Sequence, residues 1–166
     1  MPDPKSPSLQ VAPIDSGYVF RIEGRGTARE SKVFHQQAES LLTCETCQIV
    51  IDVSTCEYLD STFLGSIADL FRRFGQSVDP QFAVHGARPH CKSLFGPTRL
   101  DTVLTIHESP PATTGEFEDI AIQEDRSRAF GQHVMRCHKR LAEIESPNQK
   151  IFAGIADRMA KELGEE

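Results

Sequence analysis

The chain has 166 residues, 39% of them hydrophobic, and a net charge of -6, which suits one domain of ordinary size with an appendage. The acidic balance excludes a protein that binds DNA or RNA through a basic surface. No apolar run reaches the length of a membrane span, and the N-terminus lacks the apolar core of a signal peptide. We therefore expect a cytoplasmic protein without direct membrane insertion. Its five cysteines should then be reduced.

The N-terminal part of the chain predicts a β-hairpin followed by a helix. Residues 1–8 are a Pro- and Ser-containing tail that we expect to be disordered. Two apolar runs joined by a turn within residues 9–23 predict the hairpin. Thr27 and Glu30 have the spacing of a capping box, which predicts a helix from Thr27 to about residue 43.

The centre of the predicted fold is a strand, an acidic turn and a helix within residues 48–75. The nearly continuous apolar, β-branched run of residues 48–54 predicts a strand that is covered on both faces. We expect the helix to begin at Asp60-Ser61 and to end before Gly75. Its apolar residues recur at three- and four-residue steps, the stripe that packs on a sheet: Phe63, Ile67, Leu70, Phe71 and Phe74.

The remaining elements indicate an α/β fold. A strand at residues 81–85, a short helix at 91–94 and a last strand at 103–106 complete the order β-β-α-β-α-β-α-β. Strands that alternate with helices predict a mixed, mostly parallel sheet with helices packed on one face. Residues 107–125 are rich in proline, threonine and acidic residues and read as a linker, part of which we expect to lie against the domain.

A helical hairpin is predicted for residues 126–164. Its first helix has apolar residues at steps of four, three, four and three: Phe130, Val134, Cys137, Leu141 and Ile144. A second capping box at residues 146–149 predicts the start of the other helix. Two helices cannot bury two apolar stripes alone, so the hairpin either docks on its own domain or pairs with a second copy in a homodimer.

The turn at Asp60-Ser61 is the strongest candidate site. Both residue types cap helices by accepting a hydrogen bond from a free amide of the first turn. A hydroxyl at this position lies at the positive end of the helix dipole, where an added phosphate is tolerated. Modification would preserve the fold and add nearly two negative charges to the surface. The plain alternative is a helix cap without further chemistry.

The run YLDSTFLG at residues 58–65, preceded by a buried strand, resembles the signature of STAS domains, the anti-sigma factor antagonists of bacteria. In that family the serine directly after the aspartate is phosphorylated by a serine kinase that doubles as an anti-sigma factor. The resemblance implies that Ser61 is the acceptor, with Thr62 as the second choice. Phe63 stands where the family most often has glycine, and it is either a knob that binds a partner or a plug of the core.

The resemblance implies a STAS-like fold over residues 9–106 and a regulatory protein-binding module with no enzyme activity and no cofactor of its own. Its partners would be the kinase/anti-sigma factor and a phosphatase. The implied partner-binding surface consists of Arg25, Arg29, Asp60, Ser61, Thr62, Phe63, Leu64 and Gly65. The alternative is a scaffold subunit of a larger signalling or membrane transporter assembly that is not phosphorylated.

The cysteine pair Cys44 and Cys47 forms a CxxC motif whose chemistry has two alternatives. Zinc sites use two such pairs or a matching histidine pair, and the other cysteines are scattered. A redox motif stands at the start of a helix that follows a strand, whereas this one follows a helix and precedes a strand. We therefore expect small buried residues, with no metal and no catalytic residue.

Overall fold

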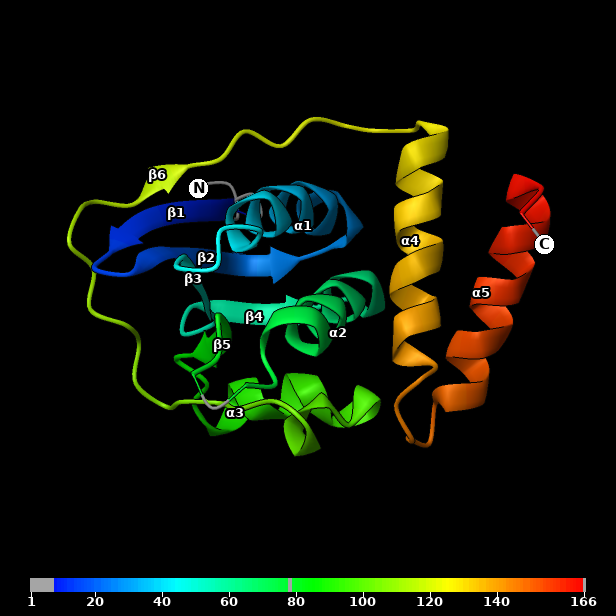
Figure 1. Ribbon diagram of the computed structural model, residues 1–166. Coiled ribbons are helices and arrows are strands. Elements are labelled where there is room, and N and C mark those ends of the chain that lie inside the picture. Colours follow the sequence, from blue (N-terminus) through cyan, green and yellow to red (C-terminus); the bar gives the residue numbers. More distant parts are fainter. Residues whose placement is uncertain (1–7, 78, 166) are drawn as a thin grey trace, which may run out of the picture.

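The computed structural model describes residues 8–77 and 79–165, so the predicted N-terminal tail lies, except for Ser8, outside the described residues. Six strands form one sheet in the order β5-β3-β2-β1-β6, and β4 pairs with the end of β2 (Figure 1). The strands are β1 (Ser8–Ile14), β2 (Gly17–Gly26), β3 (Gln48–Asp52), β4 (Cys56–Leu59), β5 (Phe82–His85) and β6 (Glu118–Asp119).

The sheet is parallel at its centre and antiparallel at one side. Strand β3 pairs in parallel with β2 and β5, and β4 pairs in parallel with β2. Strand β1 pairs antiparallel with β2 and with β6. Strand β3 is buried on both faces, because Ile49 and Ile51 belong to the main core and Val50 packs with Val19 on the opposite side. The predicted mixed α/β sheet is confirmed.

Two helices cover one face of the sheet. The α-helices are α1 (Ala28–Leu42), α2 (Ser61–Phe74), α3 (Pro89–Lys92), α4 (Arg128–Leu141) and α5 (Gln149–Leu163). The apolar stripes of α1 and α2 enter the main core, and the α1 N-terminus has the predicted cap, in which the Glu30 carboxylate accepts a bond from the Thr27 amide at 2.9 Å. None of the described helices combines the length and hydropathy needed to cross a lipid bilayer.

The C-terminal helices form an antiparallel hairpin beside the α/β domain. Figure 1 shows α4 standing against the ends of α1 and α2, with α5 on its outer side. Leu141 of α4 and Phe152 of α5 join the main core. The hairpin therefore docks on its own chain.

Three local predictions were wrong. Residues 56–59, expected as part of the turn, form β4 because they pair with the end of β2. Residues 103–106 were expected to be a strand, but the amides of Val103 and Leu104 bond back to the Leu100 carbonyl in a helical turn. Of this segment, Ile106 forms an isolated β-bridge with Val84 of β5. Ser146 does not cap α5, which is preceded by Asn148.

Candidate functional site

The turn between β4 and α2 is held by Asp60. As the N-cap residue of α2, its carboxylate accepts a hydrogen bond from the Phe63 amide at 2.9 Å, which is the predicted cap. Its second oxygen accepts from the Ala28 amide at 2.8 Å, at the start of α1. Burial raises the pKa of Asp60, and these two amide donors counteract that shift. One side chain thus ties together the N-termini of both helices that cover the sheet.

Replacing Asp60 with alanine should lower the free energy of unfolding by about 2 kcal/mol, because two partly buried amides lose a charged acceptor. Asp60→Asn keeps one carbonyl acceptor and should lose about half as much. Urea unfolding followed by circular dichroism measures both values. A loss below about 0.5 kcal/mol for the alanine variant would contradict the double cap.

Ser61 is the first residue of α2, and its hydroxyl is paired with the C-terminal hairpin. The Ser61 Oγ lies 2.9 Å from Nε2 of His138, a buried residue of α4. Nδ1 of His138 is 2.8 Å from the Val134 carbonyl oxygen, which can only accept, so Nδ1 carries a hydrogen. In the neutral imidazole Nε2 is then an acceptor, and the Ser61 hydroxyl donates to it.

The four residues after Ser61 are buried: Thr62, Phe63, Leu64 and Gly65. The Phe63 ring is fully buried and stacks on Phe34 with a centroid distance of 5.3 Å. Of its two predicted roles, Phe63 has that of the core plug. Thr62 is 4% exposed, so its hydroxyl is a much less accessible acceptor than that of the half-buried Ser61.

Arg25 and Arg29 are exposed near the same turn, at the ends of β2 and the start of α1. The Arg25 guanidinium lies over the ring of Tyr58 on β4, 4.3 Å from its centroid. Tyr58 is 41% exposed. Sequence reasoning missed this residue because β4 was not predicted, although an aromatic residue two positions before the capping aspartate was a usable signal. The pair extends the exposed surface around Ser61.

Helix α4 covers the α2 surface next to Ser61 at close range. A Cβ atom added to Gly65 would lie 2.5 Å from the Cys137 carbonyl oxygen, so glycine permits this approach of the two backbones. At the next residue, the Ser66 hydroxyl lies 3.5 Å from the Cys137 sulfur. Burial raises the pKa of the Cys137 thiol to about 12, so this thiol is a neutral packing group.

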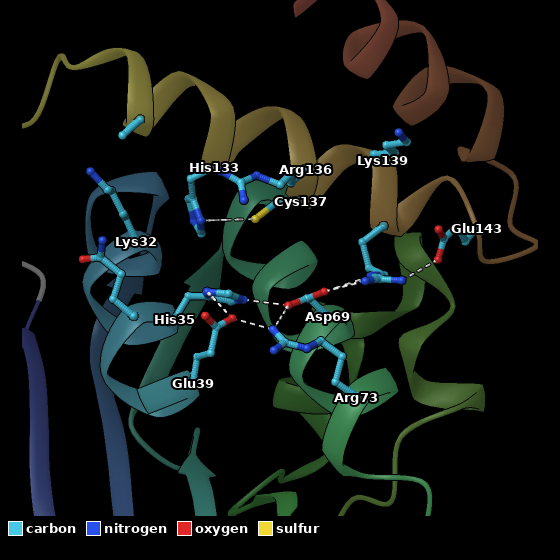
Figure 2. A pocket seen from close by; sticks show the side chains of 13 residues that line it. Lys32, His35, Glu39, Asp69, Arg73, His133, Arg136, Cys137, Lys139 and Glu143 are labelled. Atoms are coloured by element: carbon cyan, nitrogen blue, oxygen red, sulfur yellow. Dashed lines mark hydrogen bonds and ion pairs between the residues drawn. The ribbon is translucent and has the colours of Figure 1, made fainter. Parts of the chain in front are cut away.

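A cavity of about 580 Å³ lies between α1, α2 and α4, and Figure 2 shows the charged side chains that line it. At its centre Asp69 accepts from Arg140 at 2.7 Å and from His35 at 2.7 Å. Burial alone would raise the pKa of the Asp69 carboxyl, but the bonds from His35 and Arg140 hold it well below its ordinary value. Arg73 pairs with Glu39 across the same space. The cavity is thus lined by an ion-pair network that joins α4 to α1 and α2.

His35, Glu39 and Asp69 bring three metal-ligating atoms within 4.8 Å of one another. Both carboxylates already accept bonds from guanidinium groups, Glu39 from Arg73 and Asp69 from Arg140 and Arg73. A cation would have to displace these arginines, so the residues present do not fit a metal centre.

The Cys44 and Cys47 pair lies in the turn between α1 and β3, away from Ser61. The expectation of a buried residue was wrong for Cys44, which is exposed because it lies in this turn. The hydrogen bond from the Thr46 hydroxyl lowers the pKa of its thiol. Burial raises the pKa of Cys47. These thiols are free and contribute nothing to the Ser61 turn.

A single mixed sheet with two helices on one face and a capped serine turn before α2 defines a small α/β domain of the STAS type. The family model described as "Mlab, STAS domain" matches residues 11–106, more than half of the chain. The chain belongs to the STAS domain family, which confirms the resemblance of its turn motif.

One solved structure supports the fold, and a second is reported beside it. An anti-sigma factor antagonist from Mycobacterium paratuberculosis is 20% identical, with a TM-score of 0.53, and covers 66% of this chain and 92% of its own. A proposed anti-sigma factor antagonist from Thermotoga maritima is 17% identical, with a TM-score of 0.48, and covers 60% of this chain and 85% of its own. At such identities the likeness shows the fold alone. A search of curated proteins found no match.

Proposed function

We propose that this chain is an anti-sigma factor antagonist, a regulatory module that binds a protein partner through the surface around Ser61. The observation that carries the proposal is the position of the Ser61 hydroxyl, half-buried at the start of α2 and next to the capping Asp60. Exposed Arg25, Arg29 and Tyr58 lie on the elements that meet at this turn and supply cationic and aromatic groups of the kind found at protein interfaces.

The switch in this proposal is phosphorylation of Ser61 by a serine kinase that is also the anti-sigma factor, with ATP bound by the kinase and a phosphatase to reset the site. A phosphate there would be tolerated by the helix N-terminus. It would also place nearly two negative charges beside the Asp60 carboxylate, in the centre of the interface. Desolvating that charge weakens binding, so the unmodified chain is the partner-binding form.

Intact-mass measurement with site mapping, on the protein purified from its native cells in several growth states, tests the switch. We expect one added phosphate on Ser61 that varies with growth state, because this hydroxyl is less buried than that of Thr62. Ser61→Ala should abolish the modification, and Thr62→Ala, the matched control, should retain it. An unmodified Ser61 in every growth state would overturn the switch.

The second candidate is a scaffold subunit that is never phosphorylated. It is favoured by the hydrogen bond between Ser61 and His138, since this bond gives the hydroxyl a structural partner. Under this alternative Ser61→Ala leaves regulation unchanged and costs at most a small amount of stability. The growth-state experiment above therefore separates the two candidates.

A further inference from the structure

The C-terminal hairpin lies on the surface that the proposed function requires a partner to reach. The family match ends at residue 106, and the hairpin follows it. His138 holds the Ser61 hydroxyl, and the Cys137 backbone lies against Gly65. A kinase that transfers phosphate to Ser61 must reach the Oγ atom through the space in front of it. In the closed chain α4 fills that space, and its His138 is bonded to the Oγ atom. The hairpin and the partner therefore compete for one surface.

Several hydrogen bonds and ion pairs join α4 and its flanking residues to the domain, beside the apolar contacts of Leu141 and Phe152 with the main core. The His133 ring of α4 lies 2.8 Å from the Ser31 hydroxyl of α1, which also bonds to Ser66 of α2 at 2.5 Å within the domain. Around it lie the ion pairs Arg140–Asp69, Arg72–Glu143 and Lys32–Asp125. Water replaces such bonds when the surfaces part, so each contributes little net free energy. Polar contacts of this kind are typical of parts that move relative to one another.

The connection to the hairpin permits such movement. Strand β6 holds the linker to β1 through Glu118 and Asp119. Residues 121–126, which follow, have no regular secondary structure and join the start of α4. The apolar contacts of the hairpin with the main core involve Leu141 and Phe152, near its helix–helix turn. The hairpin can therefore separate from the Ser61 surface while the sheet and its two covering helices stay folded.

We propose that the α4–α5 hairpin is a displaceable cover that excludes the protein partner from the Ser61 surface in the closed chain. This inference rests on the proposed function, because it assigns the regulation of the same site. A competing partner binds the exposed Arg25 and Tyr58 first and then displaces the hairpin. This displacement makes Ser61 accessible. The chain then carries its own inhibitor of partner binding.

Hydrogen–deuterium exchange of the full chain tests the cover without a known partner. In the wild type, the amides of α4 and of residues 60–66 should exchange at one shared rate, set by opening of the hairpin. This shared rate should be faster than the exchange rate of the β3 amides. Arg140→Glu, which places a carboxylate against Asp69, should raise that shared rate about tenfold or more, while β3 stays unchanged. Arg158→Glu, an equal charge change on an exposed position of α5, should leave all rates unchanged.

A crosslink gives the opposite perturbation. Ser66→Cys places a thiol near Cys137, where the present Oγ–Sγ distance is 3.5 Å, so oxidation should join α2 to α4. The oxidised protein should show a shared rate about tenfold or more slower than the same protein after reduction. The proposal of a displaceable cover would be overturned if the α4 amides exchanged only at the rate of the β3 amides, both in the wild type and in Arg140→Glu. The hairpin would then unfold with the domain as one cooperative unit.

Phosphate mapping in native cells separates this inference from the proposed function. More phosphate on Ser61 in Arg140→Glu than in the wild type and in Arg158→Glu supports both. Equal phosphate in all three overturns the cover and leaves the switch standing. An unmodified Ser61 in all three, combined with a faster shared exchange in Arg140→Glu, overturns the switch, while the exchange data still support a displaceable hairpin.

Discussion

Replacing Phe63 with alanine should lower the free energy of unfolding by about 3 to 5 kcal/mol. The Phe63 ring is fully buried and stacks on Phe34, which in turn meets Phe20 edge to face at 5.4 Å. Truncation leaves a cavity among these rings that the rigid sheet behind them cannot fill. Urea unfolding followed by circular dichroism measures the loss, with the slope of the transition expected to stay constant.

Two controls show whether the loss at Phe63 comes from packing. Phe63→Leu keeps most of the volume and should cost about 1.5 kcal/mol or less. Ile151→Ala, at a position that is 59% exposed, should change stability by less than about 0.5 kcal/mol. If Phe63→Ala costs no more than the Ile151 control, the ring is not part of the core, and the role of a partner-binding knob returns.

Acidification should loosen the hairpin. The His133 ring is largely buried between α1 and α4, and this burial, with the positive charge of neighbouring groups, lowers its pKa to about 4. In an open hairpin the ring would return to its ordinary value of 6.5. The open state therefore binds more protons between these two values. The closed state is fully favoured above pH 6.5 and loses about 3 kcal/mol as the pH falls to 4.

Charged groups around His133 modify this pKa. Asp69 opposes the shift, but its own pKa is depressed, so its contribution is lost only in stronger acid. The groups that face the ring come from three helices: Lys32 and His35 of α1, Asp69 of α2, and Arg136 and Cys137 of α4.

Exchange measurements at several pH values, with an NMR titration of the ring protons, check the acid loosening. The His133 resonance should have its midpoint near 4. His133→Asn keeps a polar partner for Ser31 without titrating, so its opening should vary little over the same range. A wild-type midpoint near 6.5 would contradict the buried, neutral ring.

Much of the fold could be predicted because its signals are local. The β-branched run of β3, the Thr27–Glu30 capping box and the Asp60 cap each involve residues within a few positions of one another. Strand β4 was missed because four residues with two exposed side chains carry no periodic pattern, and they become a strand only by pairing with β2.

The capped serine turn was predictable from sequence, but what covers it was not. The bond between Ser61 and His138 spans 77 positions and depends on how α4 packs. His133 and His138 lie on one helix, five positions apart. Each meets a different serine, Ser31 and Ser61, and no spacing rule within one helix predicts such contacts.

The segment that connects the domain to its hairpin, residues 107–127, also covers both edges of the sheet, so that no further strand can pair there. At one margin the His107 amide bonds to the Val84 carbonyl of β5, and at the other the Thr114 and Ile120 amides bond to Pro13 and Leu9 of β1. Bare sheet margins template pairing with foreign chains. Proteolysis within residues 108–117 would release this shield, so we expect nicked protein to aggregate, whereas intact protein should stay in solution.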